Sequence, residues 1–236
     1  PIPSDDDVGS CSEHYPLEDM VQGPSLSKLD KTLIESWTAA NNTGGVFNYG
    51  VDNVPTKILP GKYGIVVQLN KDRATMRRKP APFQHVQEPF SDNHFNFSKI
   101  PHSELLLDIT IHRSNSPDAP ALEGSLIVNT APICPTHCLL LPSPARHCPQ
   151  LLDQDGLHFA LSTVFLSASR SFRVGLNSLC ALASVNHYHY HAYYLQQRLY
   201  LETADVVQVS GPCYTFADYF APGFVFQIRS HSLPRD

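Results

Sequence analysis

The 236-residue sequence has no apolar run long enough to span a membrane, few cysteines, no excess of positive charge and no signal peptide. A membrane-spanning helix needs roughly 18 consecutive apolar residues, and no segment approaches that length. The 17 Lys and Arg are outnumbered by 22 Asp and Glu, which argues against nucleic acid or an anionic membrane as a partner. Six cysteines are too few for a disulfide scaffold. These shortages predict a soluble, cytoplasmic protein.

The beginning of the chain predicts a separate, loosely structured segment. Residues 1–26 are acidic, dotted with proline and serine, and without periodicity, which is typical of a flexible leader. A single domain is predicted to follow over residues 27–236. The first ten residues have neither a basic flank nor an apolar stretch, so they do not resemble a signal peptide. Because the sequence begins at Pro1 and not at Met, we expect a fragment or a processed form.

Apolar periodicity predicts two helices and several short strands in this domain. The first helix begins at a capping box on Ser27 and runs to about Ala40, where the sequence NNTGG ends it. The second covers residues 153–170 and should turn Leu157 and Phe165 toward a sheet. Strands are predicted over residues 63–69, 105–111, 125–129, 138–141, 172–177, 185–194, 198–202 and 223–228. This arrangement favours an α+β fold with a mostly antiparallel sheet and packed helices.

The most informative feature is a run of alternating histidines and tyrosines, NHYHYHAYY, over residues 186–194. Its aromatic content favours a strand. Side chains alternate between the two faces of a strand, so His187, His189 and His191 should share one face. Tyr188 and Tyr190 should then point to the other face, where their hydroxyl groups need partners.

Two chemistries could use a face of three imidazoles. One is zinc binding, in which Cys134, Cys138 or Cys148 would complete a tetrahedral site. The other is nucleophilic catalysis at phosphorus, in which one imidazole attacks a phosphoryl centre and its neighbours fix its tautomer. The spacing of the histidines serves both chemistries, so the residues alone leave the choice open.

The surrounding sequence resembles the histidine-triad superfamily, which includes galactose-1-phosphate uridylyltransferase. Within it, GLNSLCALASVNHYHYHAYYL (residues 175–195) is similar to the GDP-hexose phosphorylase branch. The same branch is resembled by LPGKYGIVVQLN (59–70), RRKP (77–80), FNFSKI (95–100) and LIVNTAPICPTHCLLLP (126–142). The resemblance covers residues 29–202 and implies a histidine-triad (HIT/GalT-like) fold. It also implies that the chain is incomplete at its C-terminal end.

This resemblance implies a reaction and its substrates. A histidine (His191) in the third position favours the animal members, which act on GDP-D-glucose, over the plant members that act on GDP-L-galactose. The expected reaction converts GDP-D-glucose and inorganic phosphate into GDP and glucose 1-phosphate through a guanylylated histidine. No cofactor and no metal are implied, and a homodimer is allowed. Two alternatives stand beside it: a nucleotide hydrolase of the same superfamily, and a non-catalytic or zinc-binding module.

The resemblance also assigns roles to individual residues. His189 is expected to be the nucleophile, His187 to orient it, and His191 to reach the phosphate or leaving oxygen. The residues expected to bind substrate or phosphate are Asn177, Ser184, His137, Arg77 and Arg78. Lys79 could add to the charge of the two arginines, and Asn129 lies where a residue contacting the nucleoside is expected.

Overall fold

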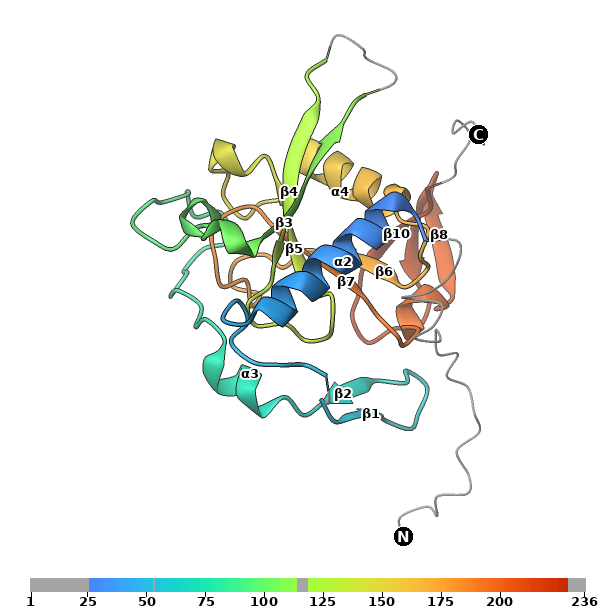
Figure 1. Ribbon diagram of the computed structural model, residues 1–236. Coiled ribbons are helices and arrows are strands. Elements are labelled where there is room, and N and C mark those ends of the chain that lie inside the picture. The colour runs from blue at the N-terminus through green and yellow to red at the C-terminus, as the bar shows by residue number, and fades with distance from the viewer. Residues whose placement is uncertain (1–25, 53, 114–118, 229–236) are drawn as a thin grey trace.

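The computed structural model describes residues 26–52, 54–113 and 119–228, so the predicted leader lies outside the described residues except for Leu26. The fold is α+β, as predicted, and its centre is a five-stranded antiparallel sheet with the order β3-β4-β5-β7-β6 (Figure 1). The strands of this central sheet are β3 (Leu105–Ile111), β4 (Leu122–Val128), β5 (Cys138–Pro142), β6 (Phe172–Gly175) and β7 (Tyr190–Tyr194).

Two helices, α2 (Lys28–Thr43) and α4 (Gln154–Leu166), cover one face of the central sheet (Figure 1). Leu33 of α2, Phe159 of α4 and Leu140 of β5 belong to one buried cluster on that face. Neighbouring strand residues alternate between the faces, so the other face of the sheet is left for a different use. The candidate site residues described below lie on that second face.

Helix α2 begins as the sequence predicts and ends later. Ser27 and Asp30 form the capping box, in which the Asp30 amide donates to the Ser27 hydroxyl at 3.2 Å. The helix continues three residues beyond Ala40 to Thr43 and ends within the predicted stop sequence NNTGG, at Gly44. The chain leaves the helix only at Gly44, whose φ of 74° suits glycine and few other residues.

Helix α4 is shorter than predicted and buries a different face. It begins after the N-cap Asp153 and ends at Leu166, and its buried positions are Gly156, Phe159, Ala160 and Thr163. The prediction that Leu157 and Phe165 face the sheet is wrong, since they are 41% and 55% exposed. The ring of Tyr188 occupies the space above Gly156, where an added Cβ would lie 2.2 Å from Tyr188 Cε1. Only glycine allows this approach.

A small hairpin and a short helix lie beside the central sheet (Figure 1). β1 (Thr56–Ile58) pairs with β2 (Val66–Gln68), and α3 (Lys71–Met76) follows. The strand predicted over 63–69 is therefore shortened to its middle, because the turn extends to Gly64, which has a φ of 49°. Helix α3 was not predicted.

The C-terminal part forms its own three-stranded sheet. β9 (Cys213–Phe216) lies between β8 (Val206–Ser210) and β10 (Phe224–Phe226), and both pairings are antiparallel. The predicted strand over 223–228 is thus present as β10, and it pairs with β9. The strand predicted over 198–202 is wrong, since Tyr200–Glu202 form a 3₁₀ turn in which Glu202 accepts from the Leu199 amide at 3.1 Å.

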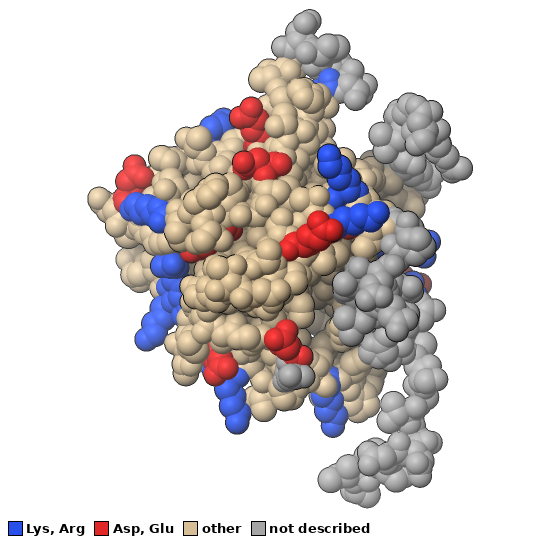
Figure 2. All heavy atoms as spheres, viewed as in Figure 1, with Lys and Arg blue, Asp and Glu red and all other residues tan. Residues whose placement is uncertain are grey.

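No helix in the described ranges is both long and apolar enough to cross a bilayer. On the face shown in Figure 2, basic and acidic side chains are interspersed, without a continuous basic patch.

Candidate active site

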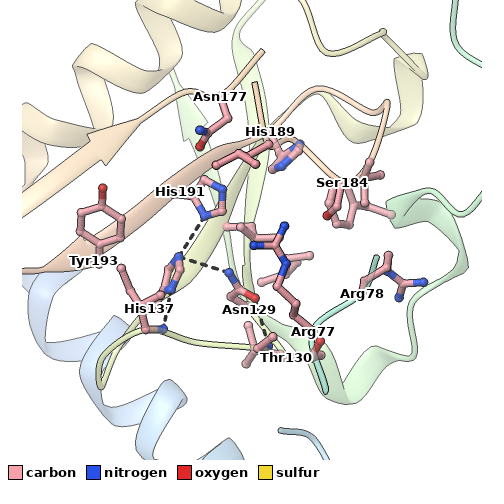
Figure 3. A pocket seen from close by; sticks show the side chains of 18 of the residues that line it. Arg77, Arg78, Asn129, Thr130, His137, Asn177, Ser184, His189, His191 and Tyr193 are labelled. Carbon is pink, nitrogen blue, oxygen red and sulfur yellow. Dashed lines mark hydrogen bonds between the residues drawn. The ribbon is translucent and has the colours of Figure 1, made fainter. Parts of the chain in front are cut away.

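A cavity of about 470 Å³ lies on the second face of the central sheet (Figure 3). Ile127 of β4, Leu139 of β5 and His191 of β7 line it, and their neighbours Leu126 and Leu140 point to the helix-covered core. The predicted site residues that line the cavity are Arg77, Arg78, His137, Asn177, Ser184, His189 and His191. Of the predicted set, His187 alone does not line it. Asn129 also contributes to the wall.

The histidine run enters the sheet later than predicted. β7 begins at Tyr190, so His187 and His189 precede the strand, and the prediction of a continuous strand from Val185 is wrong. The backbone before Tyr190 is bonded to the segment 148–150 instead of a strand neighbour. The Tyr188 amide donates to the Cys148 carbonyl at 2.9 Å, and the His189 amide donates to Gln150 Oε1 at 2.8 Å.

The Gln150 side chain forms hydrogen bonds with both the backbone amide and the backbone carbonyl of His189. Its side chain accepts from the His189 amide, and its Nε2 donates to the His189 carbonyl at 2.9 Å and to the Asn177 carbonyl at 2.8 Å. Gln150 is fully buried, and its own amide donates to Asn186 Oδ1 at 2.9 Å. One side chain thus fixes the positions of two cavity residues, His189 and Asn177. The sequence reading did not find Gln150.

The tautomer of His189 is set by its own loop. His189 Nδ1 lies 2.7 Å from the His187 carbonyl, which can only accept, so Nδ1 carries the proton. Burial and the adjacent His191 lower the pKa of His189 to about 3, so the ring is neutral near pH 7. A neutral ring protonated at Nδ1 has its lone pair on Nε2. The described residues offer Nε2 no hydrogen-bond partner, which leaves it available as a nucleophile.

The ring of His187 has a structural role. Its Nδ1 accepts from the Phe97 amide at 3.1 Å, and its Nε2 donates to the Pro144 carbonyl at 3.0 Å. Both nitrogens are therefore occupied, and the side chain is 1% exposed. The backbone carbonyl of His187 orients the His189 ring, and the His187 ring connects the segments that contain Phe97 and Pro144.

His137 and His191 form a second imidazole pair. His137 Nδ1 accepts from the Ile133 amide at 3.0 Å, so its proton resides on Nε2, which lies 2.9 Å from His191 Nδ1. Burial lowers the pKa of both rings, that of His191 to about 4, so both are neutral near pH 7. Asn129 Nδ2 also lies 3.2 Å from His137 Nε2. With its proton on Nε2, His137 donates to His191 Nδ1, and the His191 proton is placed on Nε2. His191 is thereby fixed as a hydrogen-bond donor.

Arginine side chains lie opposite the imidazoles (Figure 3). Arg77 and Arg78 follow α3 and line the cavity together with Arg73, which donates to the Ala131 carbonyl. Three guanidinium groups in one cavity favour an anionic ligand. Asn177 and Ser184 complete the polar lining, and Asn177 Nδ2 donates to the Ala181 carbonyl at 3.2 Å.

The cysteines considered for a zinc site do not share the histidine face. Cys138 and Cys148 pack with the helix-covered cluster, and Cys134 lines a different cavity. Burial raises the pKa of the Cys134 thiol to about 12. Among the described residues no group of three or more His, Cys, Asp or Glu side chains is close enough to hold a metal ion.

Comparison with known proteins assigns the family. Residues 28–193 match the family described as "GDPGP1-like, N-terminal domain". GDP-D-glucose phosphorylase 1 of Danio rerio is 39% identical over 214 residues, which cover 90% of this chain and 60% of that protein. The Homo sapiens protein of the same name is 39% identical over 209 residues, covering 86% and 53%. GDP-L-galactose phosphorylase 2 of Arabidopsis thaliana is 35% identical over 195 residues, covering 77% and 45%.

The chain spans about half the length of these curated relatives. No solved structure gives a significant match. The match over residues 28–193 extends from the start of α2 to the penultimate residue of β7, and it includes every residue that lines the cavity, with Tyr193 at its limit. The chain therefore belongs to the GDPGP1-like family, through the N-terminal domain of that family.

Proposed function

We propose that this chain carries the nucleotidyl-transfer site of a GDP-hexose phosphorylase, with GDP-D-glucose and inorganic phosphate as its substrates. The observation that carries the proposal is the state of His189, a neutral imidazole whose protonated Nδ1 is held by the His187 carbonyl. Its unprotonated Nε2 belongs to a cavity that also contains three arginines. The first five relatives are all named GDP-D-glucose phosphorylase 1, and these names support the choice of hexose.

The reaction proceeds in two displacements at the α-phosphorus. First, His189 Nε2 attacks the α-phosphorus, and the bond from that phosphorus to the bridging oxygen breaks. The bridging oxygen leaves with the β-phosphate as glucose 1-phosphate, and GMP remains on the imidazole. An oxygen of inorganic phosphate then attacks the same phosphorus, the phosphorus–nitrogen bond breaks, and GDP departs. His189 returns to its starting state.

The neighbouring groups supply charge stabilisation and position. His191, kept as a donor by His137, would bond a phosphate oxygen or the departing bridging oxygen as negative charge develops there. Arg77 and Arg78 would neutralise the diphosphate. Asn177 and Ser184 would bond further phosphate oxygens, and the His187 carbonyl keeps the nucleophile in the correct tautomer.

The wider assignments follow from the same proposal. The described α+β fold supports a HIT/GalT-like domain over residues 27–236, with the antiparallel central sheet as its platform. The five cysteines of the described ranges are free thiols, which supports a reducing, cytoplasmic location. No cofactor enters either displacement, so turnover should persist after exhaustive chelation. Loss of turnover that zinc restores would contradict that part of the proposal.

A mass measurement tests the central step. The protein is incubated with GDP-D-glucose without phosphate, and the intact chain should gain the mass of one GMP residue that is labile in acid. His189→Asn should not gain it, while His112→Asn, at a histidine outside the cavity, should behave as the unchanged chain. Addition of phosphate should release GDP. An adduct that persists in His189→Asn would overturn the assignment. Release of GMP without phosphate would instead indicate a nucleotide hydrolase.

A further inference from the structure

One row of residues crosses the central sheet along the floor of the cavity. Gly175, His191, Leu139, Ile127 and Leu105 are paired in register from β6 to β3. Neighbouring strands lie about 4.8 Å apart, so the row from His191 to Leu105 spans three spacings, or about 14 Å. The cavity therefore has one end at the imidazoles and a second end at the beginning of β3.

The middle of this row is apolar. Ile127 and Leu139 pack with Phe97 and Val185 in one cluster, and all four line the cavity. The Phe97 ring lies 5.1 Å from the His189 ring, so the apolar floor begins beside the nucleophile. A nucleoside monophosphate bound with its phosphate at His189 would lay its sugar and base along this floor. The edge of its base would then approach the second end.

The second end holds a carboxylate that the reaction at phosphorus does not use. Glu104 is half-buried, immediately precedes Leu105, and is the one carboxylate in the lining within the described part of the chain. None of the described residues forms a hydrogen bond or ion pair with its side chain. Burial raises the pKa of Glu104, and the charge of Arg78 partly offsets this. Arg78 lies with its guanidinium carbon 3.5 Å from the centre of the Phe95 ring.

A carboxylate in a cavity that binds an anionic ligand repels the negative charge of that ligand. The repulsion is offset if the carboxylate accepts hydrogen bonds from donor groups on another part of the same ligand. Guanine carries two adjacent donors, the N1–H and the 2-amino group, and they match the two oxygens of a carboxylate. Adenine presents the lone pair of N1 at the same place, and a carboxylate repels it.

We propose that Glu104 reads the guanine base of the substrate, accepting from N1–H and from the 2-amino group. This inference rests on the proposed function, since it places the α-phosphate of the same nucleotide at His189. Glu104 would thereby select a guanine nucleotide among purines. The site residues at the two ends act on different parts of one ligand.

Calorimetric titration with four nucleotides tests the inference. GMP, IMP, XMP and AMP are titrated into the unchanged chain, Glu104→Gln and the control Glu123→Gln, an exposed glutamate on β4 outside this cavity. XMP carries a carbonyl in place of the 2-amino group, so a glutamine amide can donate to that carbonyl and still accept from N1–H. Circular dichroism of each variant confirms that it is folded.

The expected result is an exchange of preference. The unchanged chain and Glu123→Gln should bind GMP about 10- to 100-fold more tightly than XMP or AMP, with IMP in between. Glu104→Gln should lose about tenfold in GMP affinity and gain about tenfold for XMP. If GMP binds and Glu104→Gln leaves the ratio of GMP to XMP affinity unchanged, this inference is wrong and the proposed function stands. If no nucleotide binds the unchanged chain, both are wrong.

Discussion

The two faces of the segment from Tyr188 to Tyr194 use side chains of similar polarity in opposite ways. On the helix-covered face the tyrosine hydroxyls are paired, Tyr188 with Tyr190 at 2.6 Å and Tyr194 with the Asp30 carboxylate at 2.7 Å. On the cavity face His189 and His191 each have one ring nitrogen engaged, and the other has no hydrogen-bond partner among the described residues. Satisfied polar groups stabilise a fold, whereas preorganised unsatisfied ones are what a substrate can use. The comparison predicts that substitutions on the two faces have separable effects.

The largest effect is expected on the cavity face, from His191→Ala. Loss of a donor that meets developing negative charge should lower kcat by about 10²- to 10³-fold. The midpoint of thermal unfolding should change little, because the side chain is only partly buried. Steady-state kinetics with GDP-D-glucose and phosphate measure the first quantity, and calorimetry measures the second.

His137→Ala should reproduce part of this loss, since His137 fixes the tautomer of His191 through the 2.9 Å contact. In the double variant the loss should be smaller than the product of the two single losses. Fully multiplicative losses would show that the two imidazoles act independently.

On the helix-covered face, Asp30→Asn should act on stability. Asp30 is fully buried and accepts from the Ser167 hydroxyl at 2.5 Å, the Ala168 amide at 2.9 Å and Tyr194. Replacing a charged acceptor by an amide should lower the free energy of unfolding by about 2–3 kcal/mol. Urea denaturation measures this loss. The kcat of the folded fraction should stay within about twofold of the original, and a kcat loss as large as that of His191→Ala would remove the distinction between the faces.

Gln150 is buried, bonds two cavity residues and does not itself line the cavity, so Gln150→Glu should have an intermediate effect. A glutamate can still accept from the His189 amide, but it has no donor for the carbonyls of His189 and Asn177. We expect guanylylation of His189 to slow by about tenfold while the dissociation constant for GMP changes less than threefold. Rapid-quench mass measurements and calorimetry give the two values. Gln150→Leu should be slower still, and equal rates in both variants would argue against positioning through these bonds.

The smallest effect on activity is expected from pH. The pKa values of about 3 for His189 and about 4 for His191 keep both rings neutral, so kcat should vary less than twofold between pH 8 and pH 6. As the pH falls, the free energy of unfolding should respond at a higher pH than kcat does. Folded-state pKa values below the ordinary 6.5 mean that the unfolded chain binds more protons, so the free energy of unfolding should begin to fall below about pH 6.5. A kcat that titrates with a midpoint near 6.5 would contradict the neutral nucleophile.

Local patterns were sufficient to predict the centre of the fold. The strands over 105–111 and 138–141 follow from short apolar runs, and the capping box at Ser27 gives the start of α2. The hairpin between β8 and β9 had a local signal as well, since Gly211-Pro212 separates two runs rich in β-formers. No strand is predicted for these two runs, whereas the φ of 50° at Gly211 makes that dipeptide a tight turn.

The missed features depend on contacts between distant segments. Gln150 binds His189 across 39 residues, and nothing near Gln150 in the sequence marks it as a partner. The same bonds replace the strand pairing that alternation predicted for His187 and His189. Tyr188 likewise decides which face of α4 is buried, because its ring needs the space beside Gly156. The periodicity of one segment contains no information about which distant residues pack against it.

The ring of His187 has a consequence for the time course of folding. Its two hydrogen bonds reach Phe97, 90 residues away, and Pro144, 43 residues away, and the pair His137–His191 closes a loop of 54 residues. Contacts of such sequence separation carry a loop-closure cost that is paid before they stabilise anything. We expect hairpins such as β3–β4 to form first and the nucleophile to acquire its tautomer last. A newly made chain would then be unable to form the guanylylated histidine until its tertiary structure is complete.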